Sequence, residues 1–190
     1  MQLLEERIRR EGQIRPGGIL KVDSFLNHQI DTALLYAMAG EIRRLYEGEG
    51  VTKVLTIEAS GIAMASMAAW LLSVPLVFAK KSKTKNISDD VYAVEIPSFT
   101  HGNTNTVVVS REYLHPGERV LLVDDFLATG AALVGLKALV EMAGGTAVGA
   151  AIAVEKAFQG GGDRLRAEGL RIESLARIAS MSDEGDITFC

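Results

Sequence analysis

Apolar and polar residues follow one another along this chain in runs that predict alternating helices and strands. Between 31 and 48 the apolar residues recur every three or four positions, which is the spacing of a helix with one buried face. Asp31 suits the N-cap of this helix, and Gly48 suits its end. The segment 1–12 mixes charged residues with leucine and isoleucine, which predicts an amphipathic helix rather than a secretory signal.

Two further stretches predict strand–helix–strand units. The first has strand 53–57, turn 58–61, helix 62–73 and strand 75–79; the second has strand 119–123, helix 131–143 and strand 146–154. Repeated units of this kind predict an α/β fold with a parallel sheet between helices, and such sheets bind ligands at the carboxyl ends of their strands. Ligand-binding and catalytic residues are therefore expected in the turns that follow the strands.

The remaining patterns are shorter. Segments 91–96 and 106–110 predict two more strands, and the polar stretch between them indicates an antiparallel hairpin beside the main sheet. Trp70 shares the helical spacing of the apolar residues around it, which predicts a place in the core. The glycine run 160–162 predicts a flexible turn.

Composition narrows the class of protein. The 190 residues are 48% hydrophobic and 23% charged, with a formal net charge of -4 and no repeat or linker, so we expect one folded domain over 1–190. The acidic balance argues against a nucleic-acid partner. No apolar stretch reaches the roughly 20 residues of a membrane span, which argues against a membrane partner. The single cysteine, Cys190, suits a reducing compartment, so we expect a cytoplasmic protein.

The sharpest chemical signal follows the strand 119–123. The sequence VLLVDDFLATGA, residues 120–131, places Asp124 and Asp125 before a loop of small residues that opens a helix. The first turn of a helix offers unpaired N–H groups, Thr129 adds a hydroxyl, and Gly130 lets a phosphate approach the backbone. The two carboxylates suit ribose hydroxyls or the water shell of Mg²⁺. An isolated Asp-Asp pair more often caps a helix, but this whole context favours a phosphate site.

Other candidate segments carry weaker signals. The turn Ala59-Ser60-Gly61 exposes backbone donors between a strand and a helix, although a tight packing turn explains it equally well. The lysine-rich segment 80–86 predicts a polar loop, for which solvation is the default explanation. Three histidines, His28, His101 and His115, have no metal-ligand spacing, so we assign no metal directly to the protein.

The motif around Asp124 resembles the phosphoribosyl pyrophosphate signature of the type I phosphoribosyltransferases. Other segments are similar to the xanthine branch of that family: LKVDSFLNHQID (20–31), TIEASGIA (56–63), VEKAFQ (154–159) and RIESLARI (171–178). The resemblance covers essentially the whole chain. It implies an α/β fold with a central, mostly parallel sheet flanked by helices, and a small hood formed by the N- and C-terminal segments.

The resemblance also implies roles for the residues that face phosphoribosyl pyrophosphate. The 5′-phosphate falls to Ala128, Thr129, Gly130, Ala131 and Ala132, the ribose hydroxyls to the catalytic pair Asp124 and Asp125, and the pyrophosphate to Ala59, Ser60 and Gly61. The lysine-rich loop is implied to be a lid, in which we choose Lys81 as the residue that reaches pyrophosphate.

Leu20, Asn27 and Lys156 match the family's base-contacting positions. Xanthine presents carbonyl oxygens at C2 and C6, and the amide of Asn27 and the ammonium of Lys156 are matching donors. Lys156 near the 6-oxo group would reject adenine, whose amino group would leave two donors facing each other. Phe158 offers a face on which the purine can stack.

The implied reaction transfers the 5-phosphoribosyl group of phosphoribosyl pyrophosphate to N9 of xanthine. Mg²⁺ is expected to bind with the substrate pyrophosphate, and a homodimer is expected from the resemblance. One alternative is an enzyme that prefers hypoxanthine or guanine, because an amide such as that of Asn27 can flip to accept from guanine. The other is a non-catalytic regulator that senses phosphoribosyl pyrophosphate, which would usually need a DNA-reading domain or a basic face.

Overall fold

The computed structural model describes residues 1–81, 90–97, 104–182 and 184–190. The helices are α1 (Gln2–Glu11), α2 (Thr32–Tyr46), α3 (Gly61–Leu72), α4 (Ala131–Met142) and α5 (Gly161–Ala167). The strands are β1 (Gln13–Arg15), β2 (Ile19–Lys21), β3 (Lys53–Ile57), β4 (Leu76–Ala79), β5 (Val91–Pro97), β6 (Thr104–Ser110), β7 (Arg119–Leu127), β8 (Thr146–Lys156), β9 (Ile172–Met181) and β10 (Ile187–Phe189). Within these ranges, no helix is both long and apolar enough to cross a membrane.

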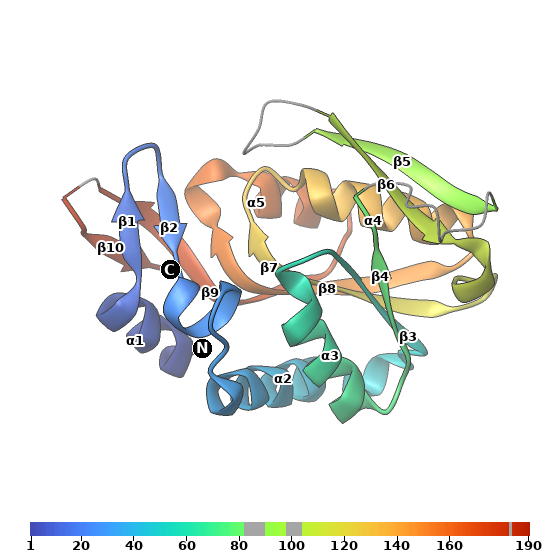
Figure 1. Ribbon diagram of the computed structural model, residues 1–190, viewed down its shortest axis with the longest axis horizontal. Coiled ribbons are helices and arrows are strands. Elements are labelled where there is room, and N and C mark those ends of the chain that lie inside the picture. The colour runs from blue at the N-terminus through green and yellow to red at the C-terminus, as the bar shows by residue number, and fades with distance from the viewer. Residues whose placement is uncertain (82–89, 98–103, 183) are drawn as a thin grey trace.

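The main sheet confirms the predicted parallel architecture. Its strand order is β10-β9-β8-β7-β3-β4, and every neighbouring pair is parallel except β10 with β9 (Figure 1). From β3 the chain moves to β4 and one edge of the sheet, whereas from β7 it moves through β8 to β9 and the other edge. The neighbours β3 and β7 are therefore the point at which the winding of the chain reverses.

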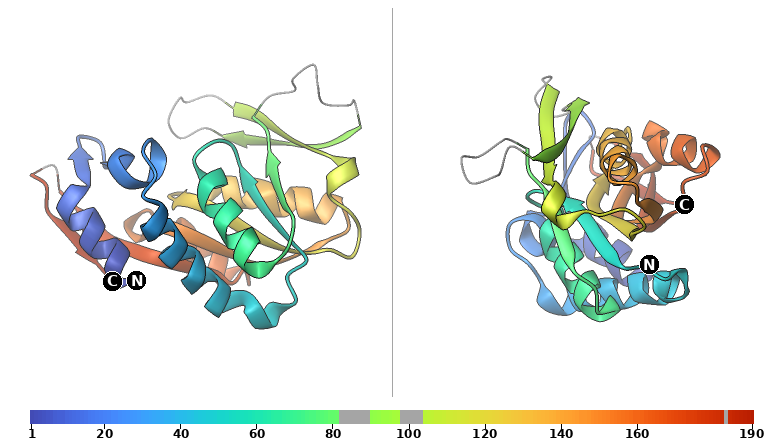
Figure 2. Two further views of the ribbon diagram at one scale, coloured as in Figure 1. Left: turned by 60° about the horizontal axis from the view of Figure 1, so that its bottom comes forward. Right: turned by 90° about the vertical axis from the view of Figure 1, so that its right-hand side faces the viewer.

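Helices cover both faces of the sheet, with α2 and α3 on one face and α4 and α5 on the other (Figure 2). Successive side chains of a strand point to opposite faces. In β7, Leu121 and Val123 pack in the core under α2 and α3, whereas Val120 and Leu122 pack in the core under α4. All four are fully buried. The continuous apolar run in the sequence thus reflects one strand that serves two cores.

The predicted hairpin of β5 and β6 is confirmed as an antiparallel pair. It joins the edge of the main sheet through a bridge between Lys80 and Val108. The hairpin packs on α4, where a Cβ on Gly135 would lie 2.2 Å from Ile96 Cδ1. A residue without a side chain therefore lets this helix and the hairpin approach closely.

The N-terminal segments lie beside the β9–β10 end of the sheet (Figure 1). Helix α1 forms over the predicted amphipathic segment, and its Arg9 Nη1 donates to the carbonyl oxygen of Ile187 at 3.0 Å. The hairpin β1–β2 and a short π-helical turn, Asp23–Asn27, follow α1. Together with the C-terminal strand β10, which α1 contacts through Arg9, these elements form the small hood expected from the N- and C-terminal segments.

Helix α2 confirms its predicted start but not its predicted end. The Asp31 side chain accepts hydrogen bonds from the backbone N–H groups of Ala33 and Leu34, as an N-cap does. The helix ends at Tyr46, and Gly50, with φ of 62°, is the left-handed residue in place of Gly48. A single 3₁₀ turn, Glu47–Glu49, separates the two, and apolar spacing does not register such a turn.

The prediction that Trp70 belongs to the core is wrong. Its side chain is 66% exposed on α3, and its ring lies 6.4 Å from that of Tyr36 on α2. Helix α3 is apolar on nearly every side, so spacing alone does not identify the buried face. The structure buries Met64, Ala65 and Ala68 instead.

We expect Tyr46→Phe to lower the free energy of unfolding by about 1 kcal/mol. The Tyr46 hydroxyl is buried and donates to the Ala150 carbonyl oxygen at 2.9 Å, so its removal leaves a buried acceptor without that donor. The same change at Tyr36, which is 53% exposed, should stay within about 0.5 kcal/mol. Urea denaturation followed by circular dichroism measures both, and equal shifts would contradict the assignment.

Candidate functional site

The candidate site lies where the carboxyl ends of β3 and β7 meet. These strands are parallel neighbours, and the chain leaves them toward opposite edges of the sheet. The segments that follow them therefore diverge and leave a crevice, which is where open α/β sheets bind ligands. Strand β7 runs to Leu127, beyond its predicted end at 123, so Asp124 and Asp125 lie within the strand. Pairing with β8 extends the strand past the apolar run.

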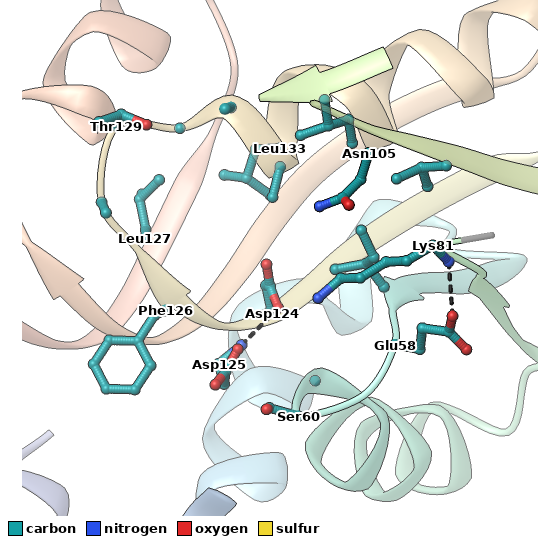
Figure 3. A pocket seen from close by; sticks show the side chains of 18 of the residues that line it. Glu58, Ser60, Lys81, Asn105, Asp124, Asp125, Phe126, Leu127, Thr129 and Leu133 are labelled. Carbon is teal, nitrogen blue, oxygen red and sulfur yellow. Dashed lines mark hydrogen bonds between the residues drawn. The ribbon is translucent and has the colours of Figure 1, made fainter. Parts of the chain in front are cut away.

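A cavity of about 250 Å³ occupies this crevice (Figure 3). Three predicted groups line it together: Ala59, Ser60 and Gly61 after β3, Asp124 and Asp125 in β7, and Ala128, Thr129, Gly130, Ala131 and Ala132 after β7. The tertiary structure thus brings the two small-residue turns to one cavity. Along the chain, the carboxylate pair stands between these two turns.

Two helices begin at this cavity. Helix α3 starts at Gly61 and helix α4 at Ala131, and both residues line the cavity. A Cβ on Gly61 would lie 2.3 Å from Thr56 Oγ1 and 3.0 Å from Asp124 Oδ1, so only glycine allows this approach to β7. Gly130 has φ of 86°, a conformation that favours glycine. The unpaired N–H groups of two first helical turns make the cavity favourable for an anion with more than one phosphate.

The buried carboxyl of Asp124 has an unfavourable electrostatic environment. Its side chain is only 5% exposed, and its Oδ1 accepts a hydrogen bond from the Asp125 N–H at 3.0 Å. Burial, and then the charge of Asp125, raise the pKa of Asp124 well above its usual value, whereas Lys81 acts to lower it. The cavity therefore favours a partner that supplies hydrogen-bond donors or positive charge to this pair.

Lys81 lies at the entrance of the lysine-rich segment and lines the cavity. Its backbone N–H donates to Glu58 Oε1 at 2.7 Å, and Figure 3 shows its side chain extending toward Asp124. This anchoring places one lysine of the segment at the carboxylates. The predicted lid continues into residues 82–89, which lie outside the described residues.

The four residues expected to read the base, Leu20, Asn27, Lys156 and Phe158, do not line this cavity in the part of the chain that the structure describes. Lys156 lies at the end of β8, and its Nζ donates to the Gly18 carbonyl oxygen at 2.8 Å in the β1–β2 hairpin that carries Leu20. Its Nζ also lies 5.6 Å from the ring centroid of Phe126, which does line the cavity. Burial lowers the pKa of the Lys156 ammonium. Lys156, which is expected to read the base, thus lies next to the cavity.

Asn27 and Phe158 each have an unusual feature for their residue type. The Oδ1 atom of Asn27 is buried, and the described residues supply it with no hydrogen-bond partner. The ring of Phe158, in the 3₁₀ turn Ala157–Gln159, is 46% exposed. A buried polar atom without a partner is rare in native proteins and suggests a functional site.

The prediction of a flexible turn at 160–162 is wrong. Gly160 has φ of 73° and precedes α5, whose first two residues, Gly161 and Gly162, are buried. A Cβ would lie 2.3 Å from the Ala128 carbonyl oxygen at Gly161, and 2.2 Å from Glu155 Oε1 at Gly162. The glycines serve close packing, which the composition of the run does not reveal.

The β5–β6 hairpin also contributes to the cavity, which the sequence pattern did not predict. Ile96, Pro97, Asn105 and Val107 line the cavity, and Figure 3 shows Asn105 across from Asp124. The sequence marks 98–105 only as polar, and nothing local indicates that the hairpin folds over the turn after β7. Within the described residues 1–81, 90–97, 104–182 and 184–190, no group of three or more His, Cys, Asp or Glu residues could hold a metal ion.

Comparisons with known proteins agree with this arrangement. Residues 21–166 match the phosphoribosyl transferase domain family. The chain is 50% identical to the xanthine phosphoribosyltransferase of Lachnoclostridium phytofermentans, over 100% of this chain and 98% of that protein. It is 51% identical to the xanthine phosphoribosyltransferase of Alkaliphilus metalliredigens, over 96% and 91%. The fold is similar to adenine phosphoribosyltransferase from Giardia lamblia complexed with 9-deazaadenine, with a TM-score of 0.78, 23% identity and coverage of 92% and 97%.

We expect Asp124→Asn to raise the free energy of unfolding at about pH 7.5 and to have a smaller effect at about pH 4. The raised pKa means that the folded protein holds the Asp124 proton more tightly than the unfolded chain does. Stability is therefore lost as the pH rises above the usual carboxyl pKa, and an amide removes this loss.

Denaturation at both pH values measures the effect. Asp186→Asn is the matched control, because Asp186 is exposed. A stability gain at about pH 7.5 that is equal to the gain at about pH 4, or absent, would contradict the electrostatic description of Asp124.

Proposed function

The chain belongs to the phosphoribosyltransferase family, and we propose that it acts as a xanthine phosphoribosyltransferase. It transfers the 5-phosphoribosyl group of phosphoribosyl pyrophosphate to N9 of xanthine, giving xanthosine 5′-monophosphate and pyrophosphate. The observation that carries this proposal is the identity of about half of all residues to xanthine phosphoribosyltransferases over the full chain. The meeting of two helix N-termini and a carboxylate pair at one cavity supports it independently.

The two small-residue turns divide the phosphates of the substrate. The backbone of Ala128–Ala132 holds the 5′-phosphate at the start of α4, and the turn Ala59–Gly61 holds the pyrophosphate at the start of α3. Both sites bind through N–H groups and helix dipoles, which need no positively charged side chain. Lys81, at the same cavity, adds a positive charge that can reach the pyrophosphate.

Asp124 and Asp125 lie between these turns and face the ribose. The C1′–O bond to pyrophosphate breaks, the C1′–N9 bond forms with inversion, and the purine releases its proton. Positive charge develops on the ribose ring as pyrophosphate leaves, and two fixed carboxyl groups stabilise that charge. The environment that disfavours charge on Asp124 becomes favourable when hydrogen-bond donors and positive charge enter the cavity. Catalysis then depends on positioning and electrostatics, without a covalent enzyme intermediate.

The base binds beside Phe126, between the end of β8 and the hood. Lys156 exchanges its bond to the Gly18 carbonyl oxygen for the 6-oxo group, and the amide N–H of Asn27 donates to the 2-oxo group. Leu20 and the exposed face of Phe158 contact the purine ring. Two donors suit the two carbonyl oxygens of xanthine and exclude adenine.

Mg²⁺ fits the cavity as a companion of the substrate. Asp124 and Asp125 lie near the pyrophosphate turn, where their oxygens would face the water shell of a Mg²⁺ ion held by the substrate phosphates. When bound, it neutralises negative charge on the departing pyrophosphate. The homodimer, the cytoplasmic location and a single domain over 1–190 remain predictions.

Competition among xanthine, guanine, hypoxanthine and adenine tests the proposed substrate. We expect kcat/KM to be highest for xanthine, measurable but lower for guanine, and negligible for adenine, because two donors face the base. The rate should fall sharply when Mg²⁺ is chelated. A preference for hypoxanthine over xanthine would favour the hypoxanthine/guanine enzyme, and binding of phosphoribosyl pyrophosphate without pyrophosphate release from any base would favour a regulator.

Asp125→Asn should reduce turnover by about 10²-fold or more, because an amide does not stabilise positive charge on the ribose ring. Initial rates of pyrophosphate release at saturating substrates measure the change, and circular dichroism checks that the variant is folded. Asp186→Asn, the same substitution on an exposed residue, should leave the rate unchanged. An unchanged rate in the Asp125 variant would remove this residue from the catalytic pair.

A further inference from the structure

Helix α5 packs directly on the loop that follows β7. Gly161 lies so close to this loop that a Cβ would stand 2.3 Å from the Ala128 carbonyl oxygen and 2.6 Å from that of Thr129. Arg164 Nη2 donates to the Thr129 carbonyl oxygen at 3.2 Å. A Cβ on Gly130 would lie 2.8 Å from Leu165 Cδ1. The backbone of the loop after β7 therefore contacts α5 directly.

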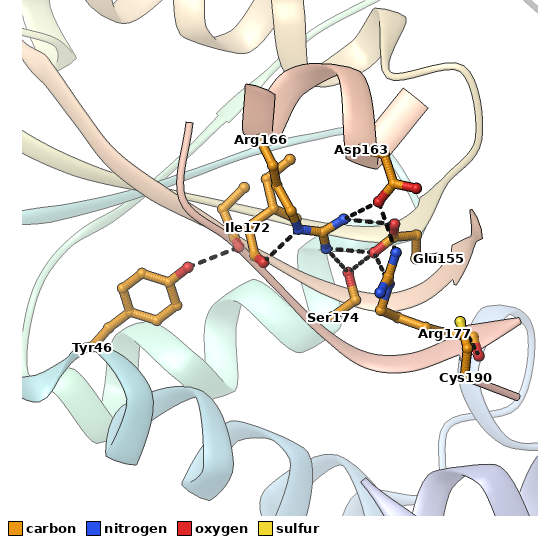
Figure 4. A network of polar contacts seen from close by, with 9 residues as sticks. Tyr46, Glu155, Asp163, Arg166, Ile172, Ser174, Arg177 and Cys190 are labelled. Atoms are coloured by element: carbon orange, nitrogen blue, oxygen red, sulfur yellow. Dashed lines mark hydrogen bonds and ion pairs between the residues drawn. The ribbon is translucent and has the colours of Figure 1, made fainter. Parts of the chain in front are cut away.

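A buried carboxylate ties α5 to the sheet (Figure 4). Glu155, 0% exposed at the end of β8, accepts hydrogen bonds from both terminal nitrogens of Arg166 at 2.8 and 2.6 Å, and from Ser174 Oγ at 2.5 Å. Arg177 Nε lies 3.2 Å from Glu155 Oε2. Burial acts to raise the pKa of Glu155, but Arg166, Ser174 and Arg177 outweigh burial and lower it. The carboxylate is therefore ionised and paired at neutral pH.

Other contacts limit how α5 can move against this carboxylate. A Cβ on Gly162 would lie 2.2 Å from Glu155 Oε1, so the first turn of α5 is pressed against Glu155. Asp163 of α5 accepts a hydrogen bond from Arg177 Nη2 of β9 at 2.8 Å. A helix of one or two turns has little stability of its own, so its position depends on these contacts.

Glu155 also connects α5 to the base-reading end of β8. Consecutive strand residues point to opposite faces, and Glu155 holds α5 while Lys156 reaches the β1–β2 hairpin at Gly18. The end of β8 thus joins the residue expected to read the base to the helix that supports the loop 128–130.

We propose that α5 positions the 5′-phosphate loop, with Gly161 and the Glu155–Arg166 pair as positioning residues. The inference rests on the proposed function, in which Ala128–Ala132 hold the 5′-phosphate. Among the described residues that line the cavity, Gly161, Glu155 and Arg166 are absent, so they act through the backbone of Ala128 and Thr129. Misplacement of a binding group by about 1 Å can cost about 10²-fold in rate or binding. The pyrophosphate turn precedes α3 on the other face and does not depend on α5.

The test compares two ligands on Gly161→Ala. We expect the affinity for ribose 5-phosphate, measured by calorimetry, to fall by about 10²-fold, while the affinity for magnesium pyrophosphate stays within about twofold. Gly161 is not in the left-handed region, so the added methyl acts through contact with the loop. Gly40→Ala in α2 is the matched control, because a Cβ there meets nothing within 4 Å.

A second variant keeps the inference testable if Gly161→Ala does not fold. Glu155→Gln preserves shape but removes the charge that holds Arg166, and we expect a loss of ribose 5-phosphate affinity of about tenfold. Glu141→Gln, which breaks an exposed pair with Lys137, is its control and should bind as the wild type does. Unchanged ribose 5-phosphate affinity in the folded variants, or an equal loss for both ligands, would overturn the proposal.

The two proposals fail separately. Ribose 5-phosphate binding involves no base, so a wild-type protein that binds it but does not use xanthine would refute the proposed function and leave the role of α5 intact. The opposite result is a wild-type protein that uses xanthine, together with folded Gly161→Ala and Glu155→Gln variants that bind ribose 5-phosphate as the wild type does. That result would refute the role of α5 and leave the proposed function intact.

Discussion

The parallel pairing of β3 with β7 is the constraint on which the rest of the site depends. Both strands end at the same edge of the sheet, and the chain leaves them in opposite directions. Two helices, α3 and α4, therefore begin at one crevice, and their unpaired N–H groups face a common volume. Sheet topology, rather than any single residue, brings the two small-residue turns together.

This arrangement explains how a chain of net charge -4 can bind a substrate that is itself highly negative. Backbone N–H groups and helix dipoles act over the first turn of each helix and do not depend on the net charge. Asp124 is buried and its pKa is raised, so negative charge on this carboxyl is unfavourable. A partner that brings hydrogen-bond donors or positive charge would make it favourable. The site thus combines a favourable place for phosphates with an unfavourable carboxyl that positive charge relieves.

The proposed phosphate half and the proposed base half of the site come from different parts of the chain, and β8 with α5 connects them. Lys156 and Glu155 are adjacent in sequence but serve opposite faces of the strand. Glycines at 161 and 162 let α5 approach both Glu155 and the loop after β7. Because Glu155 and the two glycines act through buried charge and backbone contact, they can hold the geometry between the two halves without touching the substrate.

The sequence by itself determined those features that depend on neighbours along the chain. The spacing of apolar residues predicted β3, the β5–β6 hairpin and the helix capped by Asp31, and turn chemistry marked both small-residue turns as candidate phosphate sites. Only the tertiary structure decided that Trp70 is exposed, that the glycine run 160–162 is a packed helix start, and that Asn105 lines the cavity. These outcomes depend on which elements pack together, because burial and close contact join residues far apart in sequence, and local spacing carries no information about such partners.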